Sequence, residues 1–190
     1  MKPTTRHALK EWALQVDALL AGKQVLLLRK GGIFEKQGEF ETEHREFLLF
    51  PTLYHEKAGE IVAGAREGLA EVERRLVPDA SLHLPGLCVV EDTRWVDSLD
   101  RLHALEGLHP LAPSAVEYRY NYGKQRGLHV LTLRAYRLPQ PVVLPMEKAY
   151  DGCVSWVDLG TDLSTAGAEP AVSDAAFAQQ VAAVRTRLGA

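Results

Sequence analysis

The residues in this sequence best suited to chemistry are a basic pair that ends an apolar stretch and precedes two glycines. They are Arg29, Lys30, Gly31 and Gly32, which follow directly after residues 25–28. Glycine tolerates positive φ and a close backbone approach, so consecutive N–H groups there can form a concave anion site. Arg29 adds a planar fork of donors that matches a phosphate group. A surface hairpin with charged ends would have the same sequence, so both interpretations stay open.

A second candidate site is His55 with Glu56, at the expected end of another strand. A histidine beside a carboxylate can bind a divalent metal ion or act as a general base. These two residues are therefore the candidate catalytic groups if the protein is an enzyme. His44 precedes the same strand, and an extended strand of that length would separate it from His55 by ~30 Å, which excludes a shared ion. A solvated strand end is the alternative.

Basic and aromatic side chains also alternate in a long expected strand. Arg134 and Tyr136 project from the same face of that strand, because successive side chains point to opposite faces. A cation beside an aromatic ring is what stacking on a nucleic-acid base requires, although such a pair also suits the rim of a core. With Arg45, these residues complete the candidate nucleic-acid or anion-binding surface around Arg29 and Lys30.

Well-defined catalytic motifs are absent from the sequence. There is no GxxxxGK[ST] loop, no GxGxxG, no HExxH and no GxSxG. Cys88 and Cys153 are too far apart in the chain to form a zinc motif. The stretch "AREGLAEV" is similar to part of a Nudix box, but Ala70 replaces the first glutamate of the metal-binding pair. No metal site and no cofactor are therefore evident.

The composition is that of an ordinary globular protein. The chain has 190 residues, of which 46% are hydrophobic and 25% are charged, which is enough for one domain with a sizeable core. A formal net charge of −3 gives no general attraction to nucleic acid, so such a partner would need a local basic patch. No apolar stretch approaches the ~20 residues of a membrane span. We expect no membrane association and, with only two isolated cysteines, a reducing, cytoplasmic location.

Apolar residues at spacings of three and four predict amphipathic helices at 7–21, 59–76 and 173–190. Gly22 is expected to cap the first helix, and Ser173 to cap the last. Shorter helices are expected at 94–106 and from Ser114, which with Glu117 would form a capping box. The apolar stripe of the last helix would pack on the domain or on a second copy of the chain; it contains Phe177, Val181, Val184 and Leu188.

Strands are expected between these helices, at 24–29, 46–54, 86–91, 127–138, 140–145 and 153–159. The first is apolar on both faces and is expected to be central, and Pro51 should end the regular pairing of the second. Residues 31–44 are expected to form a hairpin or loop. The strands do not alternate with long helices, which favours an α+β fold with a mixed, mostly antiparallel sheet, curled or closed into a small barrel, and packed outer helices. A single domain is expected over residues 1–160, with a linker at 161–172 before the C-terminal helix.

Four of these stretches resemble the bacterial domain-of-unknown-function family 1802. They are "HALKEWALQVDALLAGKQVLLLRKGGI", "EHREFLLFPT", "LRAYRLPQP" and "YDGCVSWVDL", and the resemblance covers roughly residues 7–159. It implies a stand-alone bacterial domain, some relatives of which are associated with restriction-endonuclease-like domains. The sequence departs from the family pattern around "PTLYHEK", where "PTYEHQ" is expected, and this departure concerns His55.

The first expected strand also resembles the start of ASCH and PUA-like barrels. In those folds a helix leads into a Gly-Lys strand that ends in arginine, beside an RNA-binding groove. The ASCH motif has a glutamate two residues before that arginine, and this chain has Leu27 there. The resemblance is therefore one of architecture.

Three functional hypotheses follow. The leading one is a bacterial module that binds or processes nucleic acid through a local basic patch, in restriction, defence or RNA metabolism. The second is a metal-dependent hydrolase that handles a small phosphate compound with His55 and Glu56. The third is a protein without catalysis that forms a homodimer through the C-terminal helix, and it predicts an intact monomer once residues 161–190 are removed.

Overall fold

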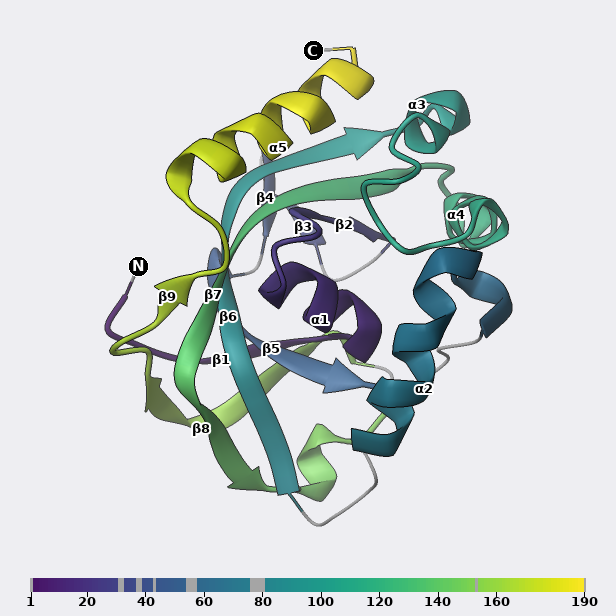
Figure 1. Ribbon diagram of the computed structural model, residues 1–190. Coiled ribbons are helices and arrows are strands. Elements are labelled where there is room, and N and C mark those ends of the chain that lie inside the picture. Colours follow the sequence, from purple (N-terminus) through teal and green to yellow (C-terminus); the bar gives the residue numbers. More distant parts are fainter. Residues whose placement is uncertain are drawn as a thin grey trace.

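The computed structural model describes residues 2–30, 33–36, 39–42, 44–53, 58–75, 81–152 and 154–189, and for 33–36 and 39–42 the description covers the backbone. The fold is α+β, as the sequence predicts, and is built on a mixed seven-stranded sheet (Figure 1). The strands are β1 (Thr4–Trp12), β2 (Leu26–Arg29), β5 (Glu46–Thr52), β6 (Ser81–Val96), β7 (Leu128–Pro145), β8 (Trp156–Ser164) and β9 (Glu169–Pro170).

The sheet is mostly antiparallel and is not closed into a barrel. Its order is β2-β7-β6-β5-β1-β8, with β9 added to β7, and β1 and β5 are the parallel pair. A separate antiparallel hairpin of β3 (Ile33–Lys36) and β4 (Glu39–Thr42) confirms the hairpin expected between 31 and 44. Strand β6 extends the strand predicted at 86–91 in both directions, and β7 joins the two strands predicted at 127–138 and 140–145. They run side by side through the molecule and curl at two register shifts (Figure 1).

The prediction of one helix over residues 7–21 is wrong in its first half. Those residues form β1, and the helix α1 begins only at Ala13 and ends at Leu20. Strand β1 lies between β5 and β8 and is buried on both faces, so Lys10 and Glu11 are 9% and 5% exposed. The two charged residues interrupt the apolar residues in the way that the polar face of an amphipathic helix does, and this pattern misled the prediction. The predicted end of the helix is correct, because Gly22 has φ +69° and its N–H donates to Leu19 O at 3.0 Å.

Two further strand predictions need correction. Strand β2 is not central: it lies at the end of the strand order and is apolar on both faces because Leu26 and Leu27 pack into two different core clusters. Pro51 does not end the pairing of β5. Pairing with β6 ends at Leu48, but pairing with β1 continues through Pro51 to Thr52. A parallel neighbour needs an N–H from alternate residues only, so proline is accommodated there.

The helices are shorter than the sequence predicts. The stretch expected as a helix at 59–76 contains the 3₁₀ turns η1 (Ala58–Glu60) and η2 (Ala63–Ala65) before α2 (Arg66–Arg75). The helix expected at 94–106 is α3 (Leu99–His103), because residues up to Val96 belong to β6. Helix α4 (Pro113–Asn121) has Ala112 at its N-cap with no side-chain hydrogen bond, so the capping box is wrong. Pro113 starts the helix instead, since its ring fixes a helical φ.

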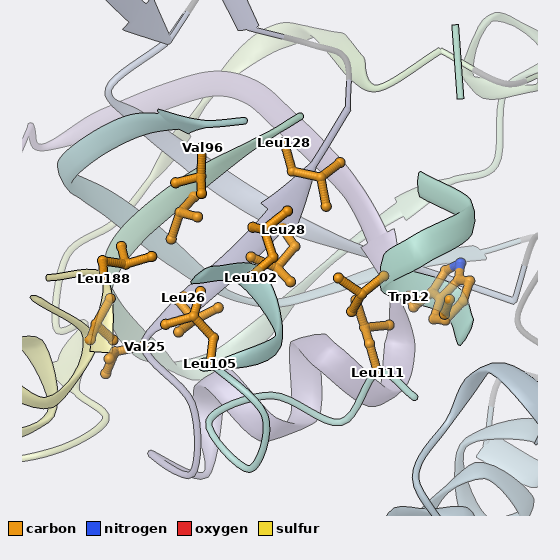
Figure 2. Close-up of a cluster of buried hydrophobic side chains, with 14 of the residues drawn as sticks. Trp12, Val25, Leu26, Leu28, Val96, Leu102, Leu105, Leu111, Leu128 and Leu188 are labelled. Carbon is orange, nitrogen blue, oxygen red and sulfur yellow. The ribbon is translucent and has the colours of Figure 1, made fainter. Parts of the chain in front are cut away.

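Helix α5 (Asp174–Arg187) starts where predicted, with Ser173 Oγ accepting from the Ala176 N–H at 3.3 Å. Its stripe of Phe177, Val181, Val184 and Leu188 is buried in a core cluster with residues of β2, β6 and β7. Figure 1 shows α5 beside β6 and β7, and Figure 2 shows Leu188 in the same cluster as Val25 and Leu26. The stripe is thus covered by its own chain. Between β7 and α5, the stretch expected as a linker includes the end of β8 and all of β9.

None of the helices described here combines the length and the apolar content that crossing a membrane requires.

Candidate functional site

A cavity of about 240 Å³ lies where β1, β2 and β5 end. We call it the cleft. Arg119 of helix α4 and the residues Gly152, Val154 and Ser155 supply its other walls. Four cationic side chains and one carboxylate are among its lining residues, which are Lys10, Glu11, Trp12, Leu28, Arg29, Lys30, Thr52, Arg119, Gly152, Val154 and Ser155. Pockets for whole small molecules span roughly 300–1,000 Å³, so the cleft suits one small group of a larger ligand.

A buried ion pair fixes Arg29 at the cleft. Its Nη1 donates to Glu11 Oε2 at 2.6 Å and to Lys10 O at 3.2 Å, and the Arg29 and Glu11 side chains are 11% and 5% exposed. The other carboxylate oxygen of Glu11 accepts from the Trp12 N–H and from Gln15 Nε2, each at 2.9 Å. A carboxylate bonded through both oxygens cannot turn away, so it holds the guanidinium in one orientation.

Arg119 reaches the cleft from α4. Its guanidinium carbon lies 4.5 Å from the centroid of the Trp12 ring, and Nη1 donates to Leu28 O at 3.2 Å. Burial lowers the pKa of Arg119 from its ordinary value, although an arginine side chain stays protonated at neutral pH. Within the described part of the chain, Leu28 O is its single hydrogen-bond acceptor. A guanidinium has five N–H donors, so several are available to an anion in the cleft.

The two lysines of the cleft donate hydrogen bonds to backbone carbonyls of neighbouring segments. Lys10 Nζ donates to Tyr150 O and, at 3.0 Å, to Gly152 O. Lys30 Nζ donates to Tyr120 O at 3.1 Å, to Gly127 O at 2.8 Å and to Gln125 O. Burial lowers the pKa of Lys30 from its ordinary value. Both ammonium groups therefore add positive charge near the cleft while their donors bind backbone carbonyls.

The structure separates the residues that the sequence grouped into one surface. Arg29 and Lys30 lie at the cleft, and Gly31 and Gly32 lie outside the described residues. The side chain of Arg45 is exposed and does not line the cleft.

Arg134 pairs with Asp174 at the start of α5, and its guanidinium carbon lies 5.0 Å from the Phe177 ring and 5.8 Å from the Tyr136 ring. Arg134 is therefore part of the contact between α5 and the sheet, and Tyr136 packs against a different core cluster.

The candidate catalytic residues His55 and Glu56 lie outside the described residues, so the metal-dependent enzyme stays a prediction from sequence. In the ranges that the structure does describe, no three His, Cys, Asp or Glu side chains are grouped as ligands for a metal ion.

Sequence reasoning missed Lys10, Glu11, Trp12 and Arg119. The adjacent charges of Lys10 and Glu11 within an apolar stretch were the available signal, since buried charges need partners. Arg119 lies in "VEYRYNYG" and has no such signal. It joins the site only because α4 packs beside the ends of β1 and β2.

Comparison with known proteins gives a family match and a set of similar folds. The model of DUF1802, described as "Domain of unknown function (DUF1802)", matches residues 8–183, so the match extends well beyond residue 159, where the sequence resemblance ends. Among solved structures, the chain is similar to ASCH from Zymomonas mobilis, with a TM-score of 0.46 and 11% identity over 93% of this chain and 92% of that one. A mutant of that protein gives a TM-score of 0.47 and 9% identity over 97% and 99% of the two chains. No curated protein matches the chain.

Proposed function

The chain belongs to the DUF1802 family, and from that premise and the lining of the cleft we propose that it binds nucleic acid and holds a backbone phosphate in the cleft. The main support for this proposal is that four cationic side chains line one small cavity: Lys10, Arg29, Lys30 and Arg119. Against these four cations stands Glu11, whereas the whole chain has a formal net charge of −3. The cleft is then the local basic patch that an acidic protein needs to attract a polyanion.

The cations have different roles in this proposal. Arg119 is the direct phosphate contact, because its guanidinium has donors that the described residues do not engage. Arg29, held in place by Glu11, presents a second guanidinium in a fixed orientation at the same cavity. Lys10 and Lys30 raise the local potential and keep the cleft walls in position through their carbonyl bonds.

The size of the cleft favours a polymer over a free metabolite. At about 240 Å³ it is smaller than the pockets that enclose complete small ligands, so a ligand must continue outside it. A strand of nucleic acid does this naturally, since each phosphate is one group of a long chain. Trp12 adds an apolar ring to the cleft wall, and this buried ring holds Arg119 in place through the stacked guanidinium.

The first test is binding of labelled single-stranded RNA, single-stranded DNA and duplex DNA over a salt series. We expect Arg119→Ala and Arg119→Gln to weaken binding by about tenfold or more, since a charged hydrogen bond contributes on the order of 1.5–3 kcal/mol. The slope of log Kd against log salt should fall by about one, as for the loss of one phosphate contact. Glutamine at position 119 keeps the methylene stem and an uncharged N–H donor, so it separates the loss of charge from the loss of the whole side chain.

Arg185→Ala is the matched control, because Arg185 is an exposed arginine on α5 that does not line the cleft. It should bind as the wild type does. The proposal is wrong if the folded wild type binds none of the three probes at low salt. It is also wrong if both Arg119 variants bind with unchanged affinity and salt slope.

A further inference from the structure

Two large aromatic side chains are exposed at the C-terminal end of α4. Tyr118 and Tyr122 are 67% and 61% exposed, and their ring centroids are 6.1 Å apart at an interplanar angle of 39°. The rings are near each other but tilted, so neither covers the face of the other. Tyrosines this exposed leave apolar ring faces in water, which is the arrangement of a platform on which another flat group stacks.

These tyrosines flank Arg119 in the chain, although they do not themselves line the cleft. Tyr118 directly precedes Arg119 on α4, and Tyr122 is the C-cap residue three positions after Arg119. Arg119 itself lines the cleft. If a ligand's phosphate is bound by Arg119, the part of the ligand that continues along α4 would contact the two tyrosine rings.

The loop after α4 adds positive charge without any opposing acid. Lys124 and Arg126 are exposed, and no Asp or Glu occurs from Tyr118 to Gly127. Lys30 binds three carbonyls in this same stretch, those of Tyr120, Gln125 and Gly127. The rings and cations are thus carried by a segment that is tied to the strand end at the cleft, which lowers the ordering cost of binding.

We infer that Tyr118 and Tyr122 stack on bases of a single strand that leaves the cleft along α4, while Lys124 and Arg126 contact its backbone. This inference rests on the proposed function and names its substrate as single-stranded nucleic acid. Bases within a duplex are already stacked on one another, so their faces are closed to tyrosine, whereas bases of a single strand are open. Exposed rings and cations on one segment can thus contact the bases and the phosphates of such a strand.

The test uses a labelled single strand of about ten nucleotides, within the usual site sizes, and a duplex of the same sequence. The double variant Tyr118→Ala/Tyr122→Ala should bind the single strand about tenfold more weakly or worse, since each stacked base contributes substantially. Its salt slope should be unchanged, because no charge is lost. Tyr118→Phe/Tyr122→Phe keeps the rings and should keep the affinity. Lys124→Ala/Arg126→Ala should instead lower the salt slope by roughly two.

The outcomes separate this inference from the proposed function. If the Ala/Ala variant binds the single strand like the wild type while the Arg119 variants are impaired, the platform is wrong and the cleft stands. If the wild type prefers the duplex, the platform is also wrong. If the wild type binds neither probe, the proposed function fails and the inference fails with it.

Discussion

At the scale of single residues, the fold holds two histidines in surroundings that oppose their protonation. His109 is 7% exposed and accepts the Leu111 N–H on Nδ1 at 3.2 Å; burial, helped by the charge of Arg119, lowers its pKa to about 4. His129 is also 7% exposed, and burial together with the charge of Lys30 lowers its pKa to about 4. Both side chains are therefore neutral at physiological pH. Each is buried beside a cation of the cleft, so protonation at acid pH places a second positive charge near Arg119 or Lys30 and destabilises the fold there.

The pH dependence of stability follows from these two pKa values. An unfolded histidine takes up a proton near its ordinary pKa of about 6.5, whereas the folded ones resist until about 4. The unfolded state thus binds more protons in that window, and stability falls as the pH drops from about 6.5 to 4. His109→Asn keeps a side-chain acceptor for Leu111 and does not titrate. Between pH 6 and pH 5 we expect it to remove roughly 1 kcal/mol per pH unit of this loss, measured by urea unfolding.

His83 provides the comparison, because its side chain is exposed and lies on β6, outside the lining of the cleft. His83→Asn, an exposed substitution, should leave the free energy of unfolding at pH 7 within about 0.5 kcal/mol of the wild-type value. A slope in His109→Asn equal to the wild-type slope would contradict this account of His109.

At the scale of elements, the sequence predicts best what depends on neighbouring residues. The Gly22 cap and the Ser173 start of α5 are correct because a few adjacent residues determine them. The β1 strand is missed because its cause is non-local: Lys10 and Glu11 are acceptable in a buried strand only when Tyr150, Gly152 and Arg29 supply their partners. The capping box fails for a local reason, since Pro113 is the first helical residue and Ser114 therefore lies inside the helix and not at its N-cap.

The candidate site divides in the same way. Arg29 and Lys30 could be proposed from sequence, because a basic pair at the end of an apolar strand is a local pattern. Arg119 could not, because its place depends on how α4 packs against the strand ends. Arg134 was assigned to the binding surface from strand alternation alone, and only the docking of α5 shows its pairing with Asp174.

The loop between α4 and β7 depends on one glycine. Gly127 has φ +134°, and a Cβ at this position would lie 2.4 Å from Trp95 Cζ2. Alanine there combines backbone strain with overpacking, so we expect Gly127→Ala to destabilise the protein by about 1–3 kcal/mol. Denaturant unfolding measures this loss. The hydrogen bonds from Lys30 to the loop should weaken as well. Faster trypsin cleavage after Lys124 or Arg126 would measure this loosening.

Gly64→Ala is the matched control for this change, because a Cβ at Gly64 has open space around it. Its stability should stay within a few tenths of a kcal/mol of the wild type or rise slightly. Equal effects of the two substitutions would show that the contact with Trp95 does not limit the loop.

At the scale of the whole molecule, α5 completes the core. Phe177, Val181, Val184 and Leu188 share a cluster with residues from β2, β6 and β7, and Gln180 Nε2 donates to Gly22 O at 2.8 Å. Arg187 Nη1 donates to the carbonyls of Ala104 and Glu106 after α3, at 3.1 and 2.6 Å. The helix α5 is therefore bonded both to the residue that caps α1 and to the turn after α3. Its apolar stripe is buried in its own chain and so is not exposed to a second copy.

Removal of residues 173–190 should unfold the protein. The deletion uncovers apolar residues of β2, β6 and β7 at once, so we expect loss of the cooperative thermal transition and binding of a hydrophobic dye. Leu188→Ala is a milder change at the same contact. It should lower the free energy of unfolding by about 2–5 kcal/mol while unfolding stays cooperative. A truncated chain that stays monomeric and melts at the wild-type temperature would contradict this role of α5.

The position of β1 has a consequence for how the protein is made. This strand lies between β5 and β8, and Thr4 pairs with Ser164, so β1 is translated well before one of its two neighbours. Until β8 leaves the ribosome, that edge of β1 carries unpaired N–H and C=O groups, which invite pairing with other chains. Such long-range pairing also slows folding. Between the synthesis of β1 and that of β8, the nascent chain is therefore exposed to misassembly, which is the hazard that chaperones reduce.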